Sequence, residues 1–259
     1  MKSFIAHMIN GALSPFGARI VKLGELGSDS GEAGNPSACS LRQRLFKQLA
    51  GKGFSPTHII DVGAHMGEWS RDAHKMFPNS AFTLIEPQIE MKPYLDQFCA
   101  DAKNAKWILA GAGPAKGELL FTIASRSDSS SFTYSQADAA EQGLEQRLVP
   151  VVTLNLICEQ STLPIPEIVK IDAEGFDLNV MAGAQKLLGV TELFFVEVPL
   201  FDFWPDQSFH NITGFMREQG YEPYDVTDLN RRPSDGALAM MELAFAKKTG
   251  VLRDDNHGW

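Results

Sequence analysis

Short apolar runs alternate with helical patterns along most of the chain. The runs are rich in β-branched and aromatic residues, which favour strands. They lie at 58–62, 81–86, 106–110, 168–172, 192–197, 221–226 and 242–247. Between many of them, apolar residues recur every three or four positions, the spacing of one buried helical face. The stripes consist of Leu41, Leu45, Phe46 and Leu49; Trp69, Ala73, Met76 and Phe77; Met91, Tyr94, Leu95 and Phe98; Leu178, Met181, Ala184 and Leu188; and Ile212, Phe215 and Met216.

This alternation determines the fold class that we predict. Continuous apolar strands separated by helices are typical of a parallel sheet that is covered on both faces. The sequence therefore predicts an α/β fold, doubly wound, with a mostly parallel sheet. The stretch 118–153 departs from the alternation, because "ELLFTIASRSDSSSFTYS" and "RLVPVVTL" look like antiparallel strands around a Ser-rich turn. We expect a small antiparallel insertion at the sheet edge rather than a separate domain.

The amino-terminal part reads differently from the rest. Residues 27–40 are rich in Gly, Ser, Asn and Pro, which is typical of a linker. We therefore divide the chain into an amino-terminal helical segment and linker, 1–40, and one catalytic domain, 41–259. The stretch 4–13 has one apolar face at helical spacing, so it is expected to pack on its own domain, to form a homodimer contact, or to touch a membrane surface. It lacks a signal-peptide cleavage pattern.

Composition narrows the choice of partners and location. Apolar residues make up 44% of the 259 positions and charged residues 21%, the balance of an ordinary globular protein. The formal charge of -9 argues against nucleic acid, which is bound by clustered Lys and Arg. Cys39, Cys99 and Cys158 show no paired spacing, so neither a disulfide framework nor a zinc site is predicted. The protein is expected in the cytoplasm.

The stretch "IIDVGAHMGEW", residues 59–69, carries the first chemical signal. In a doubly wound sheet the ligand lies at the carboxyl ends of the strands, and glycines in the first strand-to-helix turn let the backbone approach it. Gly63 and Gly67 occupy that turn, with the backbone of Ala64 and His65 between them. The G-x-G-x-x-G fingerprint of nicotinamide cofactors is absent, so pyrophosphate binding is not the preferred interpretation.

A second signal comes where the next strand ends. Glu86, in "FTLIEP", is placed to accept hydrogen bonds from the two hydroxyls of a ribose, a use shared by several nucleoside cofactors. After the third strand, Ala110 and Gly111 offer only backbone groups to a base. Together these positions predict a nucleoside cofactor.

With these motifs the sequence resembles the FkbM-type methyltransferases over about residues 57–248. The resemblance rests on D-V-G-A-x-x-G, the I-E-P acid, "VVTLN", "VKIDAEGFDLNVMAGA" and "FFVEV". It implies the class I, Rossmann-like fold with seven strands and a reversed last strand, S-adenosyl-L-methionine as cofactor, and O-methylation of a hydroxyl on a sugar, glycan or polyketide-like molecule. By position it implies that Asp61, Gly63 and Gly67 form the cofactor loop and that Glu86 binds the ribose. The family commonly has Asn at His65 and an acid at Asn155.

Three carboxylates are candidates for catalysis. An alcohol attacks a methyl group well only when a base takes its proton, and Asp172, Glu174 and Glu197 follow or end predicted strands. Asp172 and Glu174 lead as base or substrate clamp, although both also suit the start of a helix. Glu197 ends an apolar run and needs a partner if it is buried. The three could offer oxygen ligands to Mg²⁺, but no ligand pattern demands a metal and none is predicted.

Alternative functions stay open at this point. An NAD(P)-dependent oxidoreductase would share the sheet and the ribose acid but should show the missing glycine fingerprint. A catalytically silent cofactor-binding or scaffold protein would tolerate the loss of the three acids, which are present. We therefore predict an S-adenosylmethionine-dependent O-methyltransferase with a small-molecule or glycan hydroxyl acceptor. The aromatic stretch 199–209 is expected either to line the acceptor pocket or to serve as core or lid packing.

Overall fold

The computed structural model describes residues 39–253 and contains a central sheet of seven strands. The strands are β1 (His58–Val62), β2 (Ala81–Glu86), β3 (Ala105–Leu109), β7 (Ile168–Ile171), β8 (Leu193–Pro199), β9 (Tyr221–Arg231) and β10 (Leu238–Lys247). Their order is β3-β2-β1-β7-β8-β10-β9. Adjacent strands from β3 to β8 are parallel, whereas β10 is antiparallel to both β8 and β9. The predicted doubly wound sheet with a reversed last strand is confirmed.

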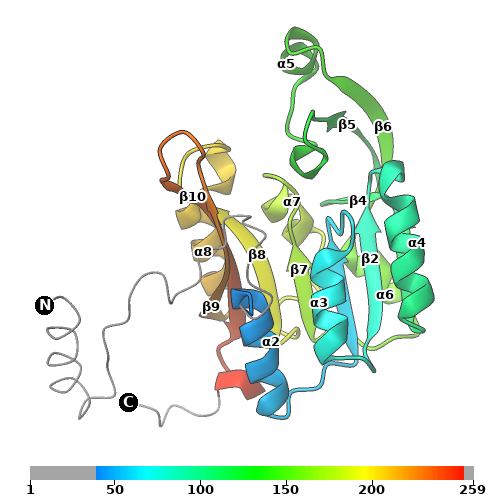
Figure 1. Ribbon diagram of the computed structural model, residues 1–259, viewed down its shortest axis with the longest axis vertical. Helices are drawn as coiled ribbons and strands as arrows, with labels where there is room; N and C mark the ends of the chain where they lie inside the picture. The colour runs from blue at the N-terminus through cyan, green and yellow to red at the C-terminus, as the bar shows by residue number, and fades with distance from the viewer. Residues whose placement is uncertain (1–38, 254–259) are drawn as a thin grey trace, which may run out of the picture. The chain divides into compact units, whose positions relative to one another are not determined.

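Helices cover both faces of this sheet (Figure 1). One face packs against α2 (Leu41–Gly51), α3 (Glu68–Met76) and α4 (Lys92–Asp101). The other packs against α6 (Leu154–Gln160), α7 (Asp177–Ala182) and α8 (Phe209–Glu218). Because successive side chains of a strand point to opposite faces, Ile59 belongs to the first core and Ile60 to the second. Both are fully buried, which explains why the strand is apolar throughout.

An aromatic cluster fixes α2 and α3 on the sheet. Phe46 of α2 makes edge contacts with Trp69 of α3 and with Phe195 of β8, at ring-centroid distances of 5.3 and 5.6 Å. Phe46 has no exposed surface. Truncating such a side chain to alanine costs about 3–5 kcal/mol. The cluster therefore holds α2 against the strand that later supplies Glu197.

The middle stretch forms a second, smaller sheet. Its strands are β4 (Gly111–Ala112), β5 (Gly117–Ile123) and β6 (Glu145–Val152), in the order β4-β6-β5. Strands β5 and β6 are antiparallel, as predicted. The connection between them contains a short 3-10 turn, η4 (Ser127–Ser129), and the helix α5 (Gln136–Glu141). Figure 1 shows α5 and the small sheet above one end of the main sheet.

Some elements differ from the sequence prediction. Helix α6 was not predicted, because "VVTL" continues the preceding strand pattern; it starts where the Thr153 side chain accepts a hydrogen bond from Leu156 N. Helix α7 ends at Ala182, earlier than its apolar stripe suggests. There the chain passes so close to another segment that a Cβ on Gly183 would lie 2.1 Å from the carbonyl oxygen of Gly113. Three more 3-10 turns, η3 (Ile89–Met91), η5 (Pro205–Gln207) and η6 (Val251–Arg253), complete the described elements.

The amino-terminal helix predicted within 4–13 lies outside the described residues. Between residues 39 and 253, the helices are too short or too polar to cross a bilayer. The membrane or dimer contact of the amino-terminal segment, the division at residue 40 and the cytoplasmic location stay predictions.

Candidate active site

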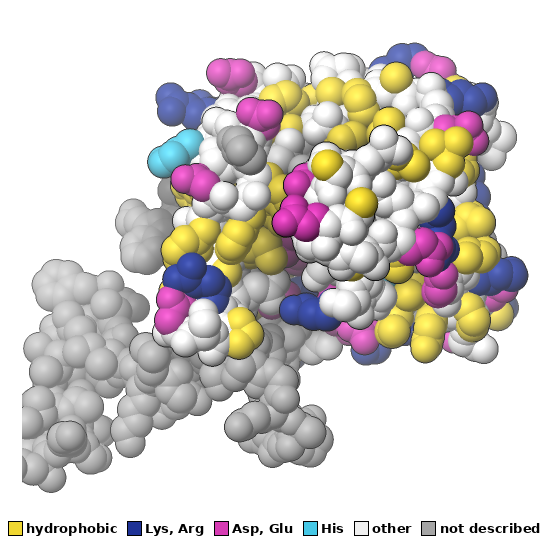
Figure 2. Space-filling model, turned by 90° about the horizontal axis from the view of Figure 1, so that it is seen from above, with side chains coloured by type: hydrophobic (Ala, Val, Ile, Leu, Met, Phe, Trp, Pro, Cys, Tyr) yellow, Lys and Arg dark blue, Asp and Glu magenta, His cyan; other side chains and the backbone are white. Residues whose placement is uncertain are grey.

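A cavity of about 280 Å³ opens where the parallel strands end. Its walls come from the turns after β1, β2, β3 and β7, from the small sheet, and from β8, β9 and β10. Figure 2 looks down on this end of the molecule and shows a hollow bordered by hydrophobic and acidic side chains. Among the predicted site residues, Gly63, Ala64, His65, Glu86, Ala110, Gly111, Asp172, Glu174 and Glu197 line the cavity. Asp61 and Gly67 are not among the lining residues.

The turn after β1 requires glycine at residue 63 for two reasons. Its φ is +69°, a left-handed conformation that costs little only without a Cβ. A Cβ would also lie 1.9 Å from the carbonyl oxygen of Asp172. Gly67 has φ +77° and precedes α3. Gly63 therefore lets the turn after β1 pass very close to the end of β7.

The backbone N–H groups of this turn are hydrogen-bonded within the protein to a larger extent than the sequence suggests. Gly63 N and Ala64 N donate to the Ile85 carbonyl oxygen at 2.9 and 3.2 Å. His65 N donates to the Glu86 carboxylate at 2.7 Å. The glycine turn thus offers a ligand mainly open space beside the strand ends rather than a row of free N–H groups.

Glu86 is the anchor of the turn. Its side chain is 2% exposed, and its two carboxylate oxygens accept hydrogen bonds from His65 N and from Gln88 N, at 2.7 and 2.9 Å. Burial raises the pKa of Glu86, although the two N–H donors act in the opposite direction. Each carboxylate oxygen has two lone pairs, so acceptor capacity is left for a ribose.

A buried lysine joins β1 to β7. Lys170 Nζ donates to the Gly63 carbonyl oxygen at 2.8 Å and lies 3.2 Å from Asp172 and 3.4 Å from Asp61. Burial alone would lower the pKa of Lys170, but Asp172 and Asp61 outweigh it and hold the pKa above its ordinary value. Asp61 also accepts a hydrogen bond from the Ser70 hydroxyl at 2.6 Å. Asp61 thus has a structural position beneath the cofactor turn, and Lys170 stays charged.

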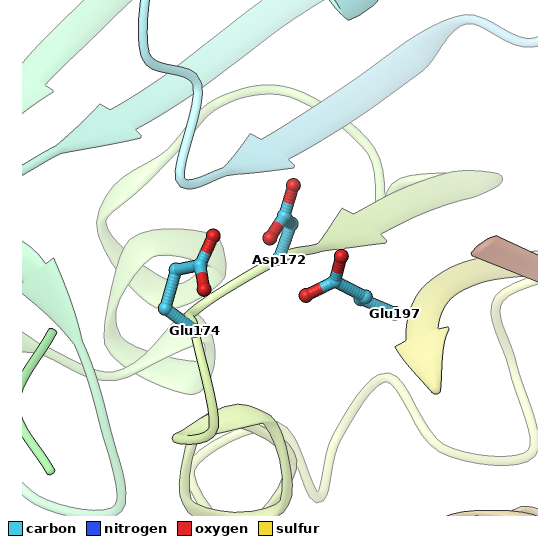
Figure 3. A group of neighbouring side chains, drawn as sticks. All are labelled: Asp172, Glu174 and Glu197. Carbon is cyan, nitrogen blue, oxygen red and sulfur yellow. The ribbon is translucent and has the colours of Figure 1, made fainter. Parts of the chain in front are cut away.

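Three carboxylates meet beside that lysine (Figure 3). Asp172, Glu174 and Glu197 come from the end of β7, the turn that follows it and β8, and each offers an oxygen within 4.8 Å of the others. Glu197 Oε2 is buried without a hydrogen-bond partner. The structure thus brings the three predicted site residues together at the end of the sheet. Their roles as base or substrate clamp stay predictions.

Crowding determines which of these carboxylates carries a proton. Burial, and then the neighbouring Asp172 and Asp177, raise the pKa of Glu174 to about 8. Burial, followed by Asp172 and Glu174, raises the pKa of Glu197 well above its ordinary value. Asp172 is the carboxylate paired with Lys170. Within the cluster, Asp172 is thus the acid paired with the lysine, while burial and the neighbouring acids favour the protonated form of Glu197.

Asp177 supports the turn that presents Glu174. Its buried carboxylate accepts a hydrogen bond from Ala173 N at 3.1 Å. Burial and the Asp172 charge raise its pKa to about 7. Helix α7 begins at Asp177 itself, so the acids at 172 and 174 do not cap that helix with their side chains.

Two residues that line the cavity adopt strained backbone conformations. His65 has φ +46° and Glu174 has φ +50°, both in the left-handed region that residues with a Cβ rarely occupy. Such strain costs of order 1–3 kcal/mol per residue and persists only where the surroundings hold it. His65 is held by its backbone bond to Glu86 and by a 2.9 Å contact between its ring and the Ser127 hydroxyl. Ser131 holds Glu174 by donating to its carbonyl oxygen at 2.7 Å.

The Ser-rich turn contributes to the site, which the sequence did not reveal. Ser127, Asp128 and Ser130 line the cavity opposite Ala110 and Gly111. Gln88 fixes this turn by donating from its side-chain amide to the Ser127 carbonyl oxygen at 2.9 Å. The sequence offered only backbone groups after β3, and Asp128, in the connection between β5 and β6, adds a carboxylate to the cavity wall. The only available signal was the cluster of Ser and Asp between two strands.

The opposite end of the cavity contains further residues that the sequence did not indicate. Arg42, Trp69, Asp228, Asn230 and Glu242 line it. Glu242 lies opposite Glu197 in the pairing of β10 with β8, so the two acids share a region of the sheet. Two donors at this end, Arg42 Nε and Trp69 Nε1, are buried without a hydrogen-bond partner. A ligand with both a carboxylate and an ammonium group would satisfy such a mixture of donors and acids.

One of the two departures from the family pattern has a structural explanation. Asn155 lies in α6, where its side chain accepts a hydrogen bond from Lys186 N at 2.9 Å. It stabilises the turn that follows α7 and does not line the cavity. The other departure, His65, is part of the cavity wall.

Comparison with known proteins adds the following findings. A sequence model described as the Methyltransferase FkbM domain matches residues 61–223. A search of curated proteins gives no significant match. Among solved structures, precorrin-6y C5,15-methyltransferase from Geobacter metallireducens GS-15 matches at 12% identity and TM-score 0.46, covering 86% of this chain and 97% of that one.

Two other solved structures hold a cofactor. The 1,6-didemethyltoxoflavin-N1-methyltransferase of Burkholderia thailandensis, with bound S-adenosylhomocysteine, matches at 11% identity and TM-score 0.45, covering 82% of this chain and 80% of that chain. Fibrillarin from Aeropyrum pernix, in complex with S-adenosyl-L-methionine, matches at 13% identity and TM-score 0.43, covering 78% and 75%.

Proposed function

Because this chain belongs to the FkbM family of methyltransferases, we propose that it transfers a methyl group from S-adenosyl-L-methionine to a hydroxyl of a sugar, glycan or polyketide-like small molecule. The observation that carries the hydroxyl acceptor is the carboxylate cluster of Asp172, Glu174 and Glu197 beside the glycine turn. An unactivated alcohol needs a base at that place.

The cavity offers matching groups along its length for each part of the cofactor. Glu86 has free lone pairs for the ribose hydroxyls, and Ala110 and Gly111 border the space for the base. At the other end, Arg42 Nε and Trp69 Nε1 suit the methionine carboxylate, while the acids suit its ammonium group. The cofactor supplies an activated methyl group on a sulfonium; positioning that group supplies much of the acceleration.

Within the cluster, Glu174 is best suited to act as the base. Asp172 is already engaged by the Lys170 ammonium at 3.2 Å. Burial raises the pKa of Glu197 well above its ordinary value, which favours its protonated form. The pKa of Glu174 is about 8, near the pH at which a general base combines a useful ionised fraction with strong proton affinity. Glu174 therefore takes the proton of the acceptor hydroxyl. Protonated Glu197 donates a hydrogen bond beside the acceptor oxygen.

The other functions considered are less well supported. The turn at Gly63 and Gly67 lacks the third glycine of a nicotinamide fingerprint, and the family match favours methyl transfer over an oxidoreductase. A silent scaffold protein would not need strained backbone at Glu174 or an unpartnered Glu197. A metal at the three carboxylates would have to compete with the Lys170 ammonium, which already neutralises Asp172.

Calorimetric titration tests the cofactor, and a methylation assay tests the acceptor chemistry. We expect S-adenosylmethionine and S-adenosylhomocysteine to bind and NAD not to bind; tight NAD binding would reverse the assignment. With labelled S-adenosylmethionine and a panel of alcohols matched to the corresponding amines, label should pass to the alcohols. Exclusive transfer to amines would refute O-methylation while leaving methyl transfer intact.

A further inference from the structure

A second cavity, of about 470 Å³, lies next to the first. Its described lining residues come from the Ser-rich connection of the small sheet, from α5, from the loop after β8 and from β10: Ser129, Ser131, Thr133, Tyr134, Asp138, Gln142, Glu174, Phe203, Trp204 and Met240. Glu174 lines both cavities. A molecule in the second cavity therefore reaches the carboxylate cluster by way of Glu174.

The aromatic side of this cavity packs closely against a glycine. A Cβ on Gly175 would lie 2.4 Å from the Trp204 ring, so the indole covers the backbone of the turn that carries Glu174. Phe203 lies beside it, with ring centroids 5.9 Å apart, and is 44% exposed. Two adjacent rings with open faces contact the C–H side of a saturated ring well. Within the aromatic stretch 199–209, Phe203 and Trp204 line this cavity.

The opposite side of the cavity is polar and without positive charge. Hydroxyl or amide groups of Ser129, Thr133, Tyr134 and Gln142 line it, and these groups both donate and accept hydrogen bonds. Two acids, Asp138 and Glu174, are among the described lining residues, whereas lysine, arginine and histidine are not. Two unit charges 4 Å apart interact by about 1 kcal/mol in water and by more near a protein surface. A phosphate group in this cavity would be repelled and would find no guanidinium or ammonium partner on its described walls.

From this combination we infer that the second cavity is the methyl-acceptor site and that it selects uncharged or cationic hydroxylated ring compounds over phosphorylated or nucleotide-linked ones. The inference rests on the proposed function for the meaning of "acceptor", but the charge selection concerns binding alone. Trp204 and Phe203 contact the ring face, the hydroxyl and amide groups bind its hydroxyls, and Asp138 disfavours anions.

The experiment measures binding to the full chain saturated with S-adenosylhomocysteine. The probes are methyl glucoside, glucosamine and glucose 6-phosphate, which share one ring and differ in charge. We expect saturable binding of the first two and at least tenfold weaker binding of the phosphate. No binding of the uncharged and cationic probes overturns the acceptor site, and equal or tighter binding of glucose 6-phosphate overturns the charge selection.

Variants locate the effect. Phe203→Ala should weaken methyl glucoside binding about three- to tenfold by removing one ring face, with unchanged affinity for S-adenosylhomocysteine. Asp138→Asn should bring glucose 6-phosphate closer to methyl glucoside, whereas Asp101→Asn, an exposed change at the end of α4, should not. Unaltered binding in the first two variants would refute the assignment. Probe binding is also measured without S-adenosylhomocysteine. Failure of S-adenosylhomocysteine itself to bind would therefore refute the proposed function separately from the test of the second cavity.

Discussion

Replacing Glu174 by glutamine should make the stability of the cofactor-free protein less dependent on pH. In the folded protein the pKa of Glu174 is about 8, raised from its ordinary value of 4.5 by burial and by neighbouring acids. Between these two values the folded state holds a proton that the unfolded chain has released. The free energy of unfolding therefore falls as the pH rises, and the contribution of this group, complete below about pH 4.5, is lost by about pH 8.

The magnitude follows from the number of protons that differ between the two states. Where the folded state holds one proton more, the free energy of unfolding falls by about 1.4 kcal/mol per pH unit. Over the whole interval this gives an upper bound of about 5 kcal/mol, and because Glu174 is only partly buried we expect about 1–3 kcal/mol. For a domain of this size, 1 kcal/mol shifts Tm by about 2–4 °C. As the pH rises from 5 to 9, the Tm of the wild type should thus fall by several degrees more than the Tm of Glu174→Gln.

The assay is thermal unfolding without cofactor at closely spaced pH values from 5 to 9. Glu118→Gln is the matched control, because it makes the same chemical change at an exposed strand position. We expect the Glu174→Gln curve of Tm against pH to be flatter than the wild-type and Glu118→Gln curves, which should coincide. If Glu174→Gln runs parallel to the wild type, Glu174 does not hold the extra proton, and the reasoning that makes it the base fails.

Other changes test the site at separate points. Gly63→Ala should destabilise the fold by at least about 3 kcal/mol in urea unfolding, because the added Cβ would lie 1.9 Å from a carbonyl oxygen; normal stability would show that the turn is adaptable. Arg42→Met should weaken S-adenosylhomocysteine binding in calorimetry by about 1–3 kcal/mol if its buried Nε meets the methionine carboxylate, whereas Asp72→Asn, which breaks the same ion pair from the other side, should not. Glu86→Ala should weaken the same binding by about 1–3 kcal/mol, and unchanged affinity would remove Glu86 from the site. In a methylation assay the wild-type rate should rise with pH through about 8 as Glu174 loses its proton; a rate that is flat from pH 6 to 9 would exclude Glu174 as the base.

The strands of the parallel part could be predicted closely because burial on both faces leaves a continuous apolar run. Strands β1 and β2 have the predicted bounds. Strands β9 and β10 are longer than predicted, since their outer parts, 227–231 and 238–241, pair with each other. Helix α6 was missed because its first apolar residues continue a strand pattern and only the capping Thr153 marks the change.

The same reasoning explains which site residues could be found. Glu86, Asp172 and Glu197 were identified because acids at strand ends must meet at one edge of a parallel sheet. Arg42 and Asp128 come from a helix and from the small sheet, and their proximity depends on how distant segments pack. No local pattern carries that information. The position of Lys170 two residues before Asp172 favours the ion pair that the two form, but the bond of Lys170 to the Gly63 carbonyl oxygen needed the three-dimensional structure.

The small sheet and its connections give residues to both cavities while the strands of the large sheet keep Gly63, Glu86 and Asp172 in register. This separation makes the stretch 117–152 a natural unit for protein engineering. Grafting the corresponding stretch of another family member onto this scaffold, with Ser127 and Asp128 of the first cavity kept in place, should retarget the methyl group to a new substrate.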